Sequence, residues 1–248
     1  MAKPPLPIRI TPHALLATLV EVHYTPRTHA ELALGAFHQA LEAVGFAYER
    51  QLMGLLEQRT HDSAEPLFQG QGVSLRIRPD RLLFNCISAA ETPMPGKKDE
   101  YLGWTRYFEV IQKVVTQLYN TAQIAVFPVV SVRYINALPG LQLNEQLQVK
   151  LPPLGALPPP ETTFYRATFA DVKGFQVALS LADNQRVPGR QEVRSVFDVT
   201  VRAATADADL PTLFQRLDAA HTCEKEVFFG LLAPAFLATL QPEYEPLA

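Results

Sequence analysis

Four side chains with chemical potential lie within seven positions of one another: Asp218, His221, Cys223 and Glu224. A histidine beside a carboxylate can do general acid–base chemistry, and a cysteine beside a histidine can act as a nucleophile. All four lie in a stretch, LDAAHTCEKEVFFGLL, whose apolar residues recur at helical spacing. Which of them can cooperate therefore depends on the helix face that each one occupies.

Advancing each residue by about 100° around this helix places His221 and Glu224 inside a broad apolar arc. Asp218 lies at the edge of the arc, and Cys223 points largely away from it. A Cys–His dyad is disfavoured, because positions two apart do not face each other. What remains is an i,i+3 pair, His221 and Glu224, on the face expected to pack against a sheet. The arc itself is formed by Leu213, Phe214, Leu217, Ala220, Phe228, Leu231 and Leu232.

The His221–Glu224 pair has two interpretations. A buried carboxylate needs a partner, and Arg133 in the strand-like run VVSVRYINAL is the candidate, so we expect a polar contact of Arg133, Glu224 and His221 between two halves of the molecule. The alternative is catalysis, with His221 as general acid–base, Glu224 orienting it and Arg133 binding an anion, on a small molecule or phosphodiester. The structural interpretation is favoured. Two side chains do not make a metal site, so no metal and no cofactor are expected.

Three further anion-binding candidates are Arg76, Arg78 and Arg81, in a segment that reads as a β-hairpin, VSLRIRPDRLLFNCIS. Val73, Leu75 and Ile77 should face inward, leaving the arginines outside. Arginines on one strand face can contact phosphates, although they are more often a solvated surface. Nucleic-acid binding through this hairpin therefore stays a minor alternative.

The elements before this hairpin follow from hydrophobic periodicity and helix signals. Residues 14–24 alternate as a strand that Pro26 ends. Thr28 and Glu31 have the spacing of a capping box, which predicts a helix that Gly45 ends. Residues 46–58 are read as a strand.

The elements after the hairpin follow the same rules. Asp99 can cap a long helix whose stripe includes Trp104 and Phe108. A β-branched run follows, in which Pro128 predicts a sheet edge or a bulge. Asp209 should cap the final helix, since Pro211 suits its first turn.

These elements predict an α+β fold of two packed halves, each an antiparallel sheet or meander with a long helix on one face. Residues 1–138 form the N-terminal α+β half. Residues 139–161 are a Pro-rich connector, and residues 162–248 form a C-terminal half of three strands plus a helix. The strand-to-helix order of 46–120 and 162–238 is weakly similar, without residue-level identity.

The composition of the 248 residues is that of an ordinary soluble protein, with 48% hydrophobic and 19% charged residues. A net charge of −3 gives no reason to expect strong nonspecific nucleic-acid binding. Two cysteines are too few for a disulfide framework. No secretory profile or membrane-spanning run is visible, which predicts a cytoplasmic protein with no membrane contact. Short signatures of nucleotide-binding and hydrolytic enzymes are absent from the sequence.

Three stretches, VEVHYTP, SVRYINALPG and LDAAHTCEKEVFFGLL, resemble landmarks of a sporadically distributed family of uncharacterised bacterial proteins of about this length. The matching positions are Tyr24, Pro26, the run Arg133–Asn136, and the late L-D-x-x-H motif with Asp218 and His221. Asn136 and Asp218 are thus expected as structural polar landmarks. The resemblance implies no activity, and the Pro-rich connector has no counterpart in it. The patchy distribution of that family suits genes that travel with mobile elements or defence systems.

The sequence therefore favours a non-catalytic binding or assembly component of a multi-protein bacterial system, with a protein partner or a second copy of itself.

Overall fold

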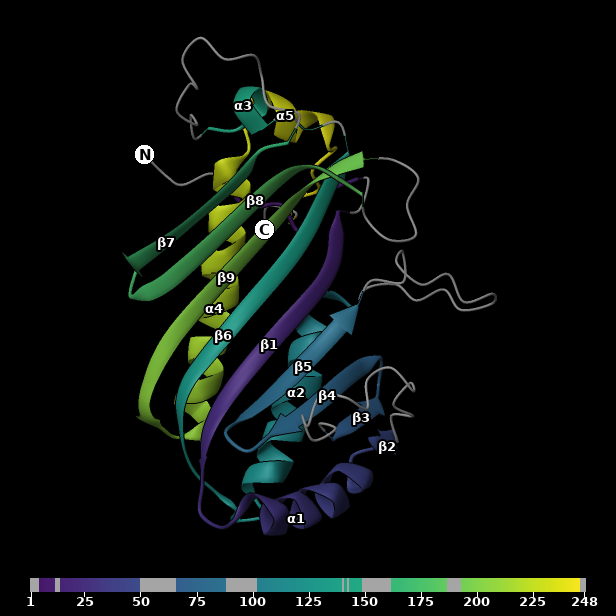
Figure 1. The fold of residues 1–248 in the computed structure, drawn as a ribbon, viewed down its shortest axis with the longest axis vertical. Helices are drawn as coiled ribbons and strands as arrows, with labels where there is room; N and C mark the ends of the chain where they lie inside the picture. The colour runs from purple at the N-terminus through teal and green to yellow at the C-terminus, as the bar shows by residue number, and fades with distance from the viewer. Residues whose placement is uncertain are drawn as a thin grey trace.

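A computed structural model describes residues 5–11, 14–49, 66–87, 102–139, 141, 143–148, 162–186 and 193–245. Helices and antiparallel strands are mixed along the chain, so the predicted α+β class is confirmed. The predicted cap Asp99, residues 50–58 of a predicted strand and residues 140, 142 and 149–161 of the Pro-rich connector lie outside the described residues. Figure 1 shows the arrangement of the elements.

One antiparallel sheet of nine strands organises the described residues, with the order β2-β3-β4-β5-β1-β6-β9-β8-β7. The strands are β1 (Leu15–Pro26), β2 (Ala47–Glu49), β3 (Leu67–Gly70), β4 (Val73–Arg78), β5 (Arg81–Ile87), β6 (Ile124–Pro139), β7 (Phe164–Val172), β8 (Phe175–Arg186) and β9 (Val193–Ala208). The sheet is continuous across the boundary predicted near residue 139, because β1 pairs with β6 and β6 pairs with β9.

Two long helices, α2 (Gly103–Tyr119) and α4 (Leu210–Leu231), lie behind the sheet as seen in Figure 1. The shorter helices are α1 (Ala30–Ala43), α3 (Leu143–Gln146) and α5 (Pro234–Thr239). No helix among the described residues is both long and apolar enough to cross a membrane.

The core lies between the sheet and this helical layer. Alternation along β1 and β6 puts Val20, Val22, Val130 and Val132 on the covered face, all fully buried. The hairpin β4–β5 behaves as predicted, since Val73, Leu75 and Ile77 are buried and Arg76 is exposed. Other large, fully enclosed side chains include Phe37, Phe46, Phe68, Phe84, Tyr107, Phe127 and Phe197.

The start of α1 departs from the prediction. The helix begins at Ala30 with His29 as the N-cap, and no side chain caps it. Thr28 instead donates its hydroxyl to the Gln123 side chain, so the capping box predicted from Thr28 and Glu31 is wrong. Thr28 and Gln123 meet because Pro26 at the end of β1 pairs with Ile124 at the start of β6. The end of α1 is as expected, since Gly45 follows it with φ +84°.

Two other local predictions, at Pro128 and Asp209, agree with the structure. Pro128 lies in a central strand, not at a sheet edge, and the pairing of β6 shifts register beside it on both sides. The bulge interpretation is therefore confirmed, because a bulge removes the need for the missing proline N–H. Asp209 caps α4 as predicted and accepts a 2.9 Å hydrogen bond from the Thr212 amide.

Candidate functional site

The His221–Glu224 pair lies between helix α4 and the covered face of the sheet. Both residues belong to α4, which packs on β6 and β9, and both are enclosed, with exposed fractions of 9% for His221 and 2% for Glu224. The predicted inward orientation is thus what the structure has. Cys223 is an exception to the helical-wheel prediction, because it is also buried, at 3%.

The reason that Cys223 is buried lies in the neighbouring strands. Its Sγ approaches the carbonyl oxygen of Val172 at the end of β7, at 4.0 Å. The end of the sheet therefore reaches beyond the arc that a flat sheet would cover, and α4 buries more than one stripe. A wheel built from α4 alone has no information about that neighbour.

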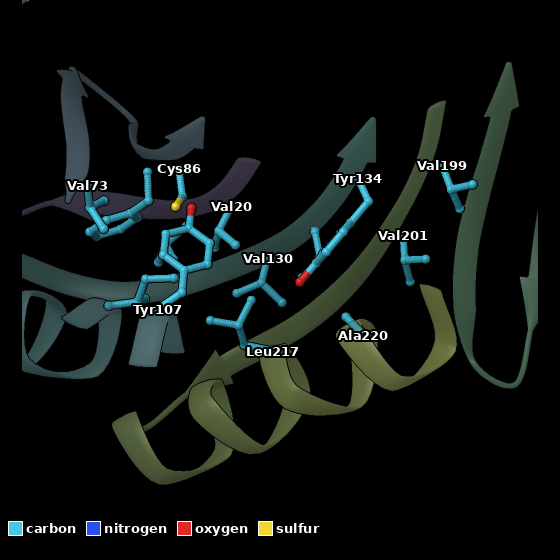
Figure 2. Packing of buried hydrophobic residues seen from close by; sticks show 14 of the residues in the cluster. Val20, Val73, Cys86, Tyr107, Val130, Tyr134, Val199, Val201, Leu217 and Ala220 are labelled. Atoms are coloured by element: carbon cyan, nitrogen blue, oxygen red, sulfur yellow. The ribbon is translucent and has the colours of Figure 1, made fainter. Parts of the chain in front are cut away.

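The imidazole of His221 lies in an aromatic stack that joins three elements. Its ring centroid is 4.0 Å from that of Trp104 on α2, with an angle of 18° between the rings, and 5.4 Å from that of Tyr134 on β6. Trp104 in turn stacks on Phe108 at 5.2 Å. We call Phe108, Trp104, His221 and Tyr134 the aromatic stack. Figure 2 shows Tyr134 reaching from β6 toward α4, where Leu217 and Ala220 lie.

Asp218 fixes the other side of Trp104. The exposed Asp218 carboxylate accepts a 2.8 Å hydrogen bond from the indole Nε1 of Trp104. In the motif L-D-x-x-H, the aspartate thus holds the indole by its polar edge while His221, three residues later, holds it by its face. Because α2 and α4 come from distant parts of the chain, both contacts are tertiary.

Burial keeps both titratable groups of the pair uncharged. Desolvation lowers the pKa of His221 to about 3, with a smaller contribution from the positive charge of Lys225. Desolvation raises the pKa of Glu224 to about 8, against the opposing effect of Lys225. At neutral pH the imidazole is therefore neutral and the carboxyl group is protonated.

Two polar atoms of the pair lack a hydrogen-bond partner among the described residues: Nδ1 of His221 and Oε1 of Glu224. A buried polar atom without a partner costs on the order of 1–3 kcal/mol. A shallow surface depression beside α4 is lined by residues that include Lys173, Gln215 and Glu226, but neither His221 nor Glu224 is among its lining residues. A molecule bound in that depression would therefore not contact His221 or Glu224.

The predicted contact between Arg133 and Glu224 is wrong. Arg133 lies on the opposite face of the sheet, where its guanidinium donates two hydrogen bonds to Asp198 on β9, Nε to Oδ1 at 2.8 Å and Nη2 to Oδ2 at 2.6 Å. This bidentate ion pair raises the pKa of Arg133 above its ordinary value. The parity of β6 decides the outcome, because Tyr134 faces α4 and its neighbour Arg133 must face away.

The three hairpin arginines share this second face, which we call the outward face. Arg81 donates to Asp80 at 3.0 Å, and it lies opposite both Arg78 on β4 and His23 on β1. The Arg78 carbonyl accepts a 2.7 Å hydrogen bond from the Tyr24 hydroxyl. Arg76 is exposed. The sheet thus separates the arginine candidates from His221 and Glu224.

Asn136, expected as a polar landmark, is buried in β6 with 6% exposure. Among the described residues no group of three or more histidine, cysteine or acidic side chains could hold a metal ion. The sequence prediction missed Trp104 and Tyr134 as the partners of His221. A usable signal was present, since Trp104 lies on the apolar stripe of its helix and Tyr134 shares strand parity with Val130 and Val132.

No family model matches this chain, and a search of curated proteins returns no match.

Proposed function

We propose that this protein is a non-catalytic binding or assembly component of a multi-protein bacterial system, associated with mobile elements or defence. The observation that carries the proposal is the enclosure of His221 and Glu224. A general acid–base pair must exchange protons with a substrate, whereas these two groups are uncharged and packed between α4 and the sheet. Their role is to join elements.

The outward face of the sheet supports a binding role. Long strands offer a broad surface there, and no described helix lies in front of it in Figure 1. Its side chains are mostly half-exposed and polar, including Glu21, His23, Arg133 and Thr200. Such a surface suits a protein partner or a second copy of this chain. We propose that this binding takes place in the cytoplasm.

We also propose that the chain consists of two similar units that meet at the centre of the sheet. In this proposal β6 belongs to the second unit, not to the N-terminal half of residues 1–138 predicted from the sequence. Outward from the centre, the strand order is β1-β5-β4-β3 on one side and β6-β9-β8-β7 on the other. A long helix follows each set, α2 after β5 and α4 after β9. The aromatic stack then joins the helices of the two units through Trp104 and His221.

The test is chemical cross-linking in the native host with the intact chain as bait, followed by recovery at mild salt and mass spectrometry. We expect the same protein partner, or a second copy, from the wild type and from Glu224→Gln. Glu224→Gln is the matched comparison because it removes the titratable group while keeping its shape. Recovery of no partner by either chain would contradict the proposal, as would loss of a host activity in Glu224→Gln without loss of folding.

A second candidate function, nucleic-acid binding through the hairpin, is favoured by one observation. Arg76, Arg78 and Arg81 lie at neighbouring positions of β4 and β5 on the outward face. Binding through phosphate contacts would weaken steeply with salt. A gel shift that is absent or insensitive to salt would exclude this candidate.

A further inference from the structure

The outward face carries a concentration of arginines from distant parts of the chain. Cross-strand register places Arg76, Arg78 and Arg81 on the same face as Arg133, Arg166 and Arg202. We call these six residues the arginine face. Three carboxylates of strand residues, Glu21, Glu49 and Asp198, share it. The complete chain has a net charge of −3, so this positive excess is local.

Register also gives the spacing of the arginines. One row runs Arg76–Leu83–Glu21–Ser131–Arg202, crossing from β4 through β5, β1 and β6 to β9. Four strand intervals of about 4.8 Å put the backbone positions of Arg76 and Arg202 about 19 Å apart. Both side chains are exposed and neither has an ion-pair partner among the described residues. Two charged anchors therefore stand at either end of the row.

Aliphatic side chains fill the space between the arginines. Leu83 lies within the row, and Leu19, Val129 and Ile135 lie at positions of the same parity on the adjoining strands, all half-exposed. No described lysine is on this face, since Lys113, Lys173 and Lys225 lie on α2, on the β7–β8 turn and on α4. Arginine with apolar area and without lysine is the composition of a protein interface.

We infer that the arginine face docks an acidic protein surface, a deepening that rests on the proposed binding function. Arg76 and Arg202 pair with carboxylates of the partner, and Leu19, Leu83 and Ile135 are covered by its aliphatic side chains. A phosphate backbone would pair with the arginines but would leave these apolar side chains exposed to water. The acidic remainder of this chain repels a bare polyanion. A partner with both acidic and apolar groups is attracted by the arginines, and its complex is then stabilised by the apolar contacts.

The test uses the purified full chain and a fluorescein-labelled peptide of Glu-Glu-Leu repeats long enough to cross from β4 to β9. Fluorescence anisotropy is measured for the wild type, Arg76→Ser and Arg202→Ser. Each substitution should weaken binding about tenfold, the loss of one charge-assisted hydrogen bond. Leu83→Ser should weaken it severalfold. Arg106→Ser on α2 and Arg216→Ser on α4 are matched controls that remove the same charge from exposed helix positions, and they should leave binding within about twofold.

Several outcomes would overturn the inference: no binding of the peptide, equal loss in the Arg106 and Arg216 controls, or equal binding of a peptide with Gln in place of Glu. Tighter binding of single-stranded or duplex DNA of matched charge, unaffected by Leu83→Ser, would assign the face to nucleic acid instead. Failure of this inference is distinguishable from failure of the proposed function. A partner cross-linked in the host equally well by wild type and by Arg76→Ser/Arg202→Ser would preserve the function and move the interface elsewhere.

Discussion

The buried carboxyl group of Glu224 makes the expected stability fall as pH rises toward 8. The pKa of Glu224 is about 8 in the folded protein because of burial, and it returns to its ordinary value of about 4.5 on unfolding. The folded state therefore keeps a proton that the unfolded state releases between these values. It follows that the free energy of unfolding falls as pH rises from about 4.5 to about 8, and this contribution is constant above that range.

The substitution Glu224→Gln should remove this fall. We expect Glu224→Gln to gain stability relative to the wild type as pH rises, on the order of 4 kcal/mol by pH 8, with the gain smallest near pH 4.5. Urea unfolding at several pH values between 4.5 and 9 measures it. Parallel profiles for the two proteins would show that Glu224 is not the group responsible.

His221 acts at the opposite end of the pH scale. Its folded pKa of about 3 lies below its ordinary value, so the unfolded state gains a proton first as pH falls below about 6.5. The imidazole contributes a loss of stability that begins near pH 6.5 and continues to about pH 3. His221→Phe, which keeps a ring in the aromatic stack, should lose less stability than the wild type between pH 6.5 and 4 in the same urea measurement. An unchanged acid limb would contradict the burial of a neutral imidazole.

At the scale of elements, removing the side chain before α4 and the one before α1 should have different effects on the free energy of unfolding. Asp209→Ala removes the hydrogen bond to the Thr212 amide and should cost about 1 kcal/mol of unfolding free energy. Thr28→Ala should cost less than about 0.5 kcal/mol, because Thr28 is exposed and does not cap α1. Thermal unfolding of both variants measures the difference. A loss of about 1 kcal/mol in Thr28→Ala would restore the capping box.

The pairing of β6 with β9 includes the Arg133–Asp198 ion pair. Reversing either charge alone should destabilise the fold by about 1–2 kcal/mol, since two like charges then face each other across adjacent strands. The double reversal Arg133→Asp/Asp198→Arg should recover part of that loss, as measured by a double-mutant cycle in urea. The same cycle with Glu224 in place of Asp198 should show no coupling. Coupling to Glu224 would reinstate the contact that the structure contradicts.

Elements were predictable from sequence where one local rule decided them. The alternation of β1, β4 and β6, the start of α4 at Asp209 and the inward direction of His221 and Glu224 all depend on residues close in the chain. Partner choice was not predictable, because it depends on strand order. Arg133 pairs with Asp198 instead of Glu224 because both Arg133 and Asp198 lie on the outward face of the paired strands β6 and β9. Helix α4, which carries Glu224, packs on the other face. Cys223 is buried because Val172, about fifty residues earlier, lies next to it.

For the whole molecule, the continuous sheet predicts one cooperative unfolding transition. The sequence contains one tryptophan, and Trp104 lies where α2 meets α4, so its fluorescence reports on the contact between these helices. Far-UV circular dichroism reports on the whole sheet. The two urea curves should coincide, because β1 and β6 cannot separate without exposing the core. A fluorescence midpoint well below that of circular dichroism would show that α2 and α4 part before the sheet unfolds.

The position of β1 in the middle of the sheet has a consequence for synthesis on the ribosome. One edge of β1 is completed by β5, but its other neighbour, β6, ends more than one hundred residues after β1 begins. At typical translation speeds this edge of β1 stays unpaired in the nascent chain for roughly 5–25 s. β-branched residues along an uncovered strand invite pairing with other polypeptides. Newly made chains should therefore depend on a chaperone during this interval, even though the finished sheet keeps the same strand in its interior.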